Sequence, residues 1–261
     1  PKRGRQSKED IEAKDREHLR ANIAVIEAGR HWGWLRLFAQ KYLLEPSELN
    51  GLVDAPDTPL RALRNCFPFL EPYIPTGQDL SLRKRQDIAE VILAACLVLY
   101  REGKELNDLD QRILAAAKSE AAAYPTFGDG EAEAFEAALD AALFTADGST
   151  EAFIRSYIEP QLSSGESHLQ QCCWLDQKPA FQYLRKSLPL EWLDRFPQMS
   201  FENVRTLFSM ASKHGDGSEL IALIDRRLAD PVIENKEEPE VEKRSRARRN
   251  FWQLNGFLYN T

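Results

Sequence analysis

Hydrophobic residues recur along most of this chain at intervals of three and four positions, which places them on one face of an α-helix. The segment 81–102 shows the pattern most clearly, and Gly103 follows it as a natural C-terminal cap. Its apolar stripe consists of Ile88, Val91, Ile92, Ala95 and Leu99. This spacing predicts a long helix that packs in the core.

The same periodicity predicts helices from end to end of the chain. They cover 8–28, 31–44, 60–70, 108–124, 131–144, 150–162, 179–188, 190–196, 201–214, 219–229 and 243–261. No segment alternates apolar and polar residues as a strand does, and no fixed repeat length emerges. Short turns marked by glycine and proline separate the helices. We therefore expect an all-α fold, either an α-solenoid or an irregular helical bundle of antiparallel helical hairpins.

Composition and charge divide the chain into five parts. A basic tail occupies 1–7, and helical repeats follow in an N-terminal group, 8–162, and a C-terminal group, 163–231. The acidic, proline-containing stretch 232–242 is expected to be a linker, and 243–261 an amphipathic helix.

The closing helix needs a surface to lie on because its last turns are rich in large apolar side chains. These side chains are Phe251, Trp252, Leu254, Phe257 and Leu258. They are predicted to form one stripe, which makes them a candidate interaction surface. The stripe either docks on the preceding helices or pairs with a further helix of a longer natural chain.

Composition sets the broad class of protein. A chain of 261 residues with 43% apolar residues can bury a substantial core. No run reaches the ~20 apolar residues that a membrane span needs, and the four scattered cysteines do not form a disulfide framework. We expect a cytoplasmic protein without a membrane partner. The net charge of −7 argues against nucleic-acid binding by the chain as a whole, but a local basic patch is compatible with it.

The basic run between residues 243 and 249 is a candidate site for an anion or a partner. Its members are Lys243, Arg244, Arg246, Arg248 and Arg249. They could hold the phosphates of a nucleic acid or another anionic partner. Four glutamates lie immediately before the run, so a solvated helical face with internal ion pairs is the competing interpretation.

Other candidate motifs are weaker. His168 and Cys172 would share a helical face beside Cys173, but a zinc site needs more ligands, and buried cysteines are the simpler interpretation. The acidic groups at 129–133 and 147–151 do not match a calcium-binding loop and are interpreted as first turns of helices. No phosphate-binding loop is found. We predict no cofactor, no metal and no identifiable catalytic residue, and place the five tryptophans in the core.

Two parts of the chain resemble a known group of proteins. The run LRANIAVIEAGRHWGWL at 19–35, with ASKHGD at 211–216, RRLADP at 226–231 and RNFWQL at 249–254, is similar to the helical-repeat regions of large bacterial STAND-type, NACHT-like ATPases associated with antiphage defence. The resemblance implies a HEAT- or tetratricopeptide-like sensor segment of a larger bacterial defence protein. The ATPase core that defines those proteins has no counterpart in this sequence, so the resemblance assigns no catalytic residue.

We therefore expect a non-catalytic helical-repeat module that binds a protein, a peptide or a neighbouring domain of the same protein. One alternative is a compact all-helical enzyme with an unrecognised carboxylate or Cys-His site. Another is an anion or nucleic-acid binder that acts through the basic run. An enzyme should gather several titratable groups in one closed pocket, whereas a solenoid should offer a continuous groove.

Overall fold

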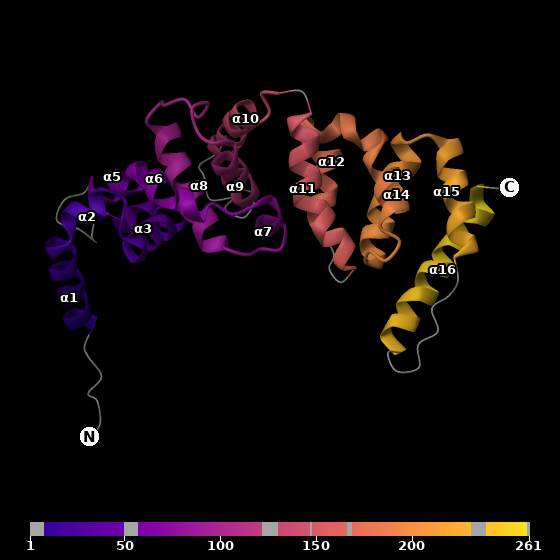
Figure 1. Cartoon of the computed structure of the whole chain (residues 1–261), viewed down its shortest axis with the longest axis horizontal. Helices are drawn as coiled ribbons and strands as arrows, with labels where there is room; N and C mark the ends of the chain where they lie inside the picture. Colours follow the sequence, from indigo (N-terminus) through magenta and orange to yellow (C-terminus); the bar gives the residue numbers. More distant parts are fainter. Residues whose placement is uncertain are drawn as a thin grey trace, which may run out of the picture. The chain divides into compact units, whose positions relative to one another are not determined.

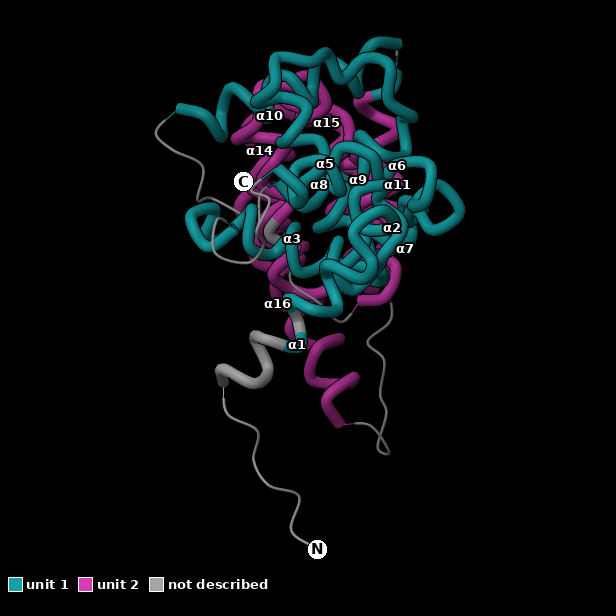
Figure 2. Tube along the Cα trace, turned by 90° about the vertical axis from the view of Figure 1, so that its left-hand side faces the viewer, with its two compact units in different colours: residues 1–149 teal, residues 150–261 magenta. Residues whose placement is uncertain are grey.

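The computed structural model describes residues 8–49, 57–121, 130–146, 148–165, 169–230 and 239–259, and all regular secondary structure in these ranges is helical (Figure 1). The predicted all-α class is confirmed. The chain falls into two compact units, residues 1–149 and 150–261 (Figure 2). The sequence-based division after residue 162 differs from this one, because residues 150–162 belong to a helix that packs on the second unit.

Unit 1 is built around one helix whose central part is fully buried. Its elements are α1 (Lys8–Ala21), α2 (Ile23–Glu27), α3 (Trp32–Leu44), η1 (Pro46–Glu48), α5 (Thr58–Asn65), α6 (Phe67–Leu70), η2 (Glu71–Tyr73), α7 (Gly77–Ser81), α8 (Gln86–Arg101), α9 (Gln111–Ala121) and α10 (Glu131–Leu143). Every residue of α8 from 91 to 99 is buried, and α8 packs against α3, α5 and α9. Burial on all sides explains why this segment is apolar around its whole circumference.

The start of the predicted helix 81–102 was wrong. Ser81 ends α7, and α8 begins only at Gln86. Arg83 and Arg85 lie between the two helices with φ values of 54° and 55°, in the left-handed region that non-glycine residues seldom adopt. Two left-handed residues break the backbone hydrogen-bond pattern of a helix, and hydrophobic periodicity gives no sign of them.

A buried lysine joins α9 to α10. The Lys118 side chain is only 1% exposed, and its Nζ lies 2.7 Å from Glu136 Oε1 and 2.6 Å from Asp140 Oδ1. Two carboxylates around one buried ammonium offset the cost of taking that charge out of water. This cluster therefore sets how the two helices pair.

Unit 2 holds the remaining described helices. They are α11 (Ser149–Ser164, with Ser149 at the unit boundary), η3 (Gln170–Cys173), α12 (Trp174–Gln177), η4 (Pro179–Lys186), α13 (Leu188–Arg195), α14 (Phe201–His214), α15 (Gly217–Ala229) and α16 (Pro239–Tyr259). Tyr157 of α11 stacks on Trp174, with ring centroids 5.5 Å apart. Glu159 of α11 accepts a 3.1 Å hydrogen bond from the indole of the buried Trp192. These contacts tie α11 to unit 2.

The hairpin of α14 and α15 follows its predicted course. The Ser200 hydroxyl accepts a hydrogen bond from the Asn203 amide and caps the start of α14. Asp216 caps α15, because its carboxylate accepts hydrogen bonds from the amides of Ser218 and Glu219. Helix α16 begins earlier than expected, at Pro239, so the last residues of the predicted linker 232–242 are helical.

Candidate functional site

Helix α16 packs on unit 2 through one face. Trp252, Asn255 and Gly256 are buried there, and α16 contacts α15 and α14. The Phe251 ring meets the Phe208 ring of α14 edge to face, with centroids 5.2 Å apart. Edge-to-face aromatic pairs add to the stabilisation that apolar burial provides. Of the two possibilities left open for this helix, docking on the preceding helices is therefore seen for its first apolar residues.

The opposite face of the same turns is exposed. Leu254, Phe257 and Leu258 have 61%, 68% and 60% of their surface accessible, respectively. They follow the i, i+3, i+4 spacing and share one side of the helix. The single predicted stripe is thus wrong, since its members divide between a buried face and an exposed one. We call Leu254, Phe257 and Leu258 the outer apolar patch.

The basic run also divides between the two faces. Lys243, Arg244 and Arg246 are exposed, and each interacts with an acidic residue of the same helix. Arg246 lies 2.6 Å from Glu242, Lys243 lies 3.8 Å from Glu240, and Arg244 donates a hydrogen bond to the Glu240 carbonyl. This arrangement is the solvated face with internal ion pairs that the sequence offered as an alternative.

Arg248 and Arg249 face the other way and bind main-chain carbonyls. Arg249 Nη1 donates to the carbonyls of Leu228 and Asp230, the latter at 2.8 Å, at the C-terminal end of α15. Arg248 donates to Gln198 Oε1 at 2.8 Å and to the Met199 carbonyl at 3.4 Å. The carbonyl end of a helix carries partial negative charge, so a guanidinium there is favourable.

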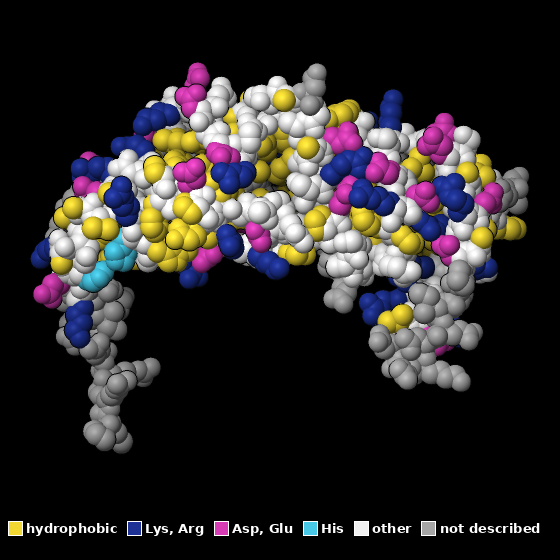
Figure 3. All heavy atoms as spheres, in the orientation of Figure 1, with side chains coloured by type: hydrophobic (Ala, Val, Ile, Leu, Met, Phe, Trp, Pro, Cys, Tyr) yellow, Lys and Arg dark blue, Asp and Glu magenta, His cyan; other side chains and the backbone are white. Residues whose placement is uncertain are grey.

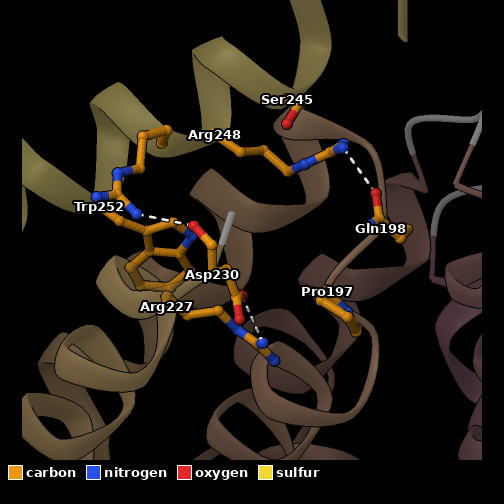
Figure 4. A pocket seen from close by; sticks show the side chains of 8 residues that line it. Pro197, Gln198, Arg227, Asp230, Ser245, Arg248 and Trp252 are labelled. Atoms are coloured by element: carbon orange, nitrogen blue, oxygen red, sulfur yellow. Dashed lines mark hydrogen bonds and ion pairs between the residues drawn. The ribbon is translucent and has the colours of Figure 1, made fainter. Parts of the chain in front are cut away.

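These two arginines line a cavity of about 240 Å³ that a third arginine completes (Figure 4). The lining residues are Pro197, Gln198, Arg227, Asp230, Ser245, Arg248, Arg249 and Trp252. Arg227 lies 3.0 Å from Asp230 and also donates to the Leu193 carbonyl at 3.0 Å. Its Nε is buried and has no hydrogen-bond partner in the part of the chain that the structure describes.

Three guanidinium groups and one carboxylate, Asp230, line this arginine cavity; Arg227 also lies 3.5 Å from Asp194, so the excess positive charge rests on Arg248 and Arg249. Burial lowers the pKa of Arg248, and the neighbouring Arg244 lowers it further. No carboxylate within the described ranges forms an ion pair with Arg248. Because guanidinium groups stay protonated near neutral pH, they can bind an anion but cannot exchange protons as an acid and base pair does. The three arginines of the cavity can therefore hold an anion.

The remaining candidates have structural explanations. Cys172 is buried, and burial raises its thiol pKa to about 12, while His168 lies outside the described residues. Glu131 forms an ion pair with Arg101 at 2.7 Å and Glu151 one with Arg155 at 2.7 Å, as expected for solvated acidic turns. Across the described ranges, no three His, Cys, Asp or Glu side chains are grouped to hold a metal ion. Four of the five tryptophans are buried, and Trp32 is half-buried.

Sequence reasoning missed Arg227, Gln198 and Asp230 as neighbours of the basic run. Asp230 lies 19 positions from Arg249 and Gln198 lies 50 positions from Arg248, and only the docking of α16 brings them together. The sequence did contain one signal for Arg227: it belongs to a basic pair, Arg226 and Arg227, at the end of a predicted helix.

Comparison of the chain with protein-family models, with curated proteins and with solved structures found no match. None of the helices in the described ranges combines the length and the apolar character needed to cross a membrane.

Proposed function

We propose that this chain is a non-catalytic protein-binding module and that the outer apolar patch is its docking surface. The observation that carries the proposal is the exposure of Leu254, Phe257 and Leu258 on a helix whose opposite face is buried. Grouped apolar side chains at helical spacing on a surface are typical of sites that receive an amphipathic helix.

Charge indicates which kind of helix fits. Helix α16 carries five basic and two acidic side chains, but Arg248 and Arg249 face unit 2. The remaining three basic and two acidic side chains give its outer side a net charge of +1, on a chain whose net charge is −7. The exposed basic residues Lys243, Arg244 and Arg246 precede the patch on this helix. A partner helix with an apolar face and acidic flanks complements both features, because opposite potentials speed association and exclude wrong partners.

The resemblance of four short segments to the helical-repeat regions of STAND-type ATPases is in keeping with a partner-sensing role. We extend the proposal to that role: binding of the acidic helix informs a neighbouring domain of a larger bacterial defence protein.

Two synthetic helical peptides test the docking surface. They share one apolar face, and one carries Glu and the other Lys on its polar face. The acidic peptide should bind the full chain more tightly by about tenfold or more in a titration followed by calorimetry. A variant with Leu254→Ser, Phe257→Ser and Leu258→Ser should lose this binding, whereas Tyr183→Ser, at another exposed aromatic position, should keep it. Equal binding of both peptides, or binding that survives the triple change, contradicts the proposal.

The arginine cavity supports a second candidate function, the binding of a small anion. Its specific observation is the half-buried Arg248, whose pKa is lowered and which has no carboxylate partner in the described residues. Inorganic phosphate or sulfate would neutralise that charge and could also bond to Ser245. Phosphate should raise the midpoint of thermal unfolding more than chloride at equal ionic strength, and Arg248→Gln should remove the difference. An equal effect of both salts rejects this candidate.

A further inference from the structure

An aromatic hollow of about 350 Å³ lies in unit 1, where the first turns of α3 and α8 meet α6 and η2. Its lining residues are Trp32, Phe69, Leu70, Tyr73, Asp87 and Ile88. Figure 3 shows hydrophobic side chains gathered on one face of this unit, with charged ones around them. Three different aromatic residues and one carboxylate converge on the hollow.

The aromatic walls come from separate elements of unit 1. Phe69 and Tyr73 lie one turn apart, with ring centroids 6.1 Å apart and planes inclined by 56°. Trp32 is half-buried at the first position of α3, and Leu70 forms a buried floor. Tyr73 is 50% exposed, so the hollow is open to a ligand from solvent. Inclined rings present several electron-rich faces to one volume, which favours a cation.

Asp87 supplies the charge. It lies in the first turn of α8, where the helix dipole stabilises a carboxylate, and its Oδ1 accepts a 3.0 Å hydrogen bond from the Ile88 amide. No ion pair of Asp87 occurs among the residues that the structure describes. Asp87 is the one charged residue among the lining residues, which are otherwise rings and aliphatic groups, and the Arg85 guanidinium donates a 3.4 Å hydrogen bond to the Tyr73 carbonyl beside them.

We propose that this hollow binds a trimethylammonium group. A primary ammonium carries three N–H donors, but the lining side chains offer only the Asp87 carboxylate and the Tyr73 hydroxyl as acceptors. Unsatisfied donors in a partly dry site would cost binding free energy. A trimethylammonium group has no N–H donor, and it gains from the aromatic faces and from the carboxylate together.

The size of the hollow agrees with a head group rather than a large ligand. Its volume lies at the lower end of the range for small-molecule sites. A trimethylammonium group can belong to a choline-type molecule or to a trimethylated lysine in a peptide, and both present the same chemistry to Asp87 and the rings. The site is formed by residues of unit 1 and shares none with the outer apolar patch, so its test does not rest on the proposed docking function.

Titration of the full chain with four probes tests the site. They are tetramethylammonium chloride, choline, a short peptide with trimethyllysine, and 3,3-dimethylbutan-1-ol, a neutral molecule with the shape of choline. We expect the charged probes to bind and the neutral one to bind about tenfold more weakly or not at all. Tighter binding of the peptide than of choline assigns the source to a protein, and the reverse assigns it to a small molecule.

Two variants examine the two parts of the site. Asp87→Asn keeps the shape and removes the charge, and Tyr73→Leu removes one aromatic face at a half-exposed position; each should weaken choline binding about tenfold. Asp108→Asn and Tyr183→Leu alter an exposed carboxylate and an exposed ring elsewhere and should leave it unchanged. Circular dichroism checks that each variant folds. Failure of all charged probes to bind the unaltered chain, or equal binding of choline and its neutral analogue, overturns the proposal.

Discussion

Gly256 of α16 lies so close to Leu228 of α15 that a Cβ atom at position 256 would come within 2.9 Å of Leu228 Cδ1. It would also lie 3.3 Å from Ile224 Cγ2. A glycine inside a helix costs stability relative to alanine, so this one is explained by the close approach of the two helices. The contact determines which side of α16 is buried and which side carries the outer apolar patch.

Replacing Gly256 by leucine should therefore loosen α16. Overpacking a close helix contact costs about 1–3 kcal/mol, and here the strain falls on the α15–α16 contact. Hydrogen exchange of the amides between residues 245 and 259 should become faster, while that of α8 stays unchanged. Gly217→Leu is the matched control because nothing lies within 4 Å of a Cβ atom there. Unchanged protection of α16 in the Gly256 variant would contradict this account of the docking.

The buried Lys118 should be more important for stability than an exposed lysine. Lys118→Met leaves Glu136 and Asp140 facing each other without their cation, and we expect a loss of about 2 kcal/mol in the free energy of unfolding. The figure is below that for fully buried pairs, because water still reaches both carboxylates. Adding Glu136→Gln and Asp140→Asn should restore part of the loss. Lys186→Met, at an exposed position, should have little effect on urea unfolding; equal losses at the two lysines would disprove the role of the cluster.

Glu120 should make stability depend on pH. Burial raises the pKa of Glu120 above its ordinary value of 4.5, Glu90 adds to this rise, and a hydrogen bond from Gln86 opposes it in part. The folded state thus holds the proton more tightly than the unfolded state. Ionisation of Glu120 therefore costs stability: the contribution of this residue is most favourable below about pH 4.5 and is lost as the pH rises through the raised pKa.

Glu120→Gln should consequently be more stable than the unaltered chain near neutral pH. The glutamine keeps an oxygen acceptor for Gln86 and cannot ionise, so the advantage should vanish in urea unfolding below about pH 4.5. Glu105→Gln, at an exposed position, is the control. An advantage of the same size at both pH values would show that the charge of Glu120 is not its cause.

Thiol labelling should distinguish the cysteines. Burial raises the thiol pKa of Cys66 and Cys172 to about 12 and raises that of Cys96 as well, so these thiols stay protonated. Cys173 is half-buried and reaches the surface. Iodoacetamide at mildly alkaline pH should modify Cys173 first, as mass spectrometry of the digested protein would reveal. Rapid modification of Cys172 in the folded chain would instead favour the alternative in which a Cys-His pair acts as a nucleophile.

Much of the helical architecture was predictable from periodicity, and α14 matches its predicted range, 201–214. The faces of α16 were not, because its buried face includes Asn255 and Gly256, which hydropathy scores as poor core residues. The Asn255 side chain donates a hydrogen bond to the Phe251 carbonyl. Gly256 lies so close to α15 that a Cβ atom there would crowd Leu228. The hydrogen bond of Asn255 lies within α16, whereas the fit of Gly256 depends on the neighbouring helix, and the apolar pattern of α16 alone encodes neither.

The arginine cavity and the aromatic hollow escaped prediction for a related reason. Arg227 meets Arg248, and Trp32 meets Asp87, only after helices distant in sequence have packed. Local patterns identify which residues are basic or aromatic, whereas tertiary packing decides which of them share a volume.

The division of the basic run between two faces limits how strongly the affinity for a polyanion can depend on salt concentration. Each phosphate contact contributes a slope of roughly −0.9 to the dependence of log K on log salt for duplex DNA. If all five cations of α16 were available, the slope could approach roughly −4.5, but Arg248 and Arg249 are occupied by carbonyls within unit 2. A nucleic acid lying along the exposed face would meet only Lys243, Arg244 and Arg246, which corresponds to a slope no steeper than roughly −2.7. The measured salt slope would thus show how many cations of α16 are available to phosphates, and therefore whether only its exposed face takes part.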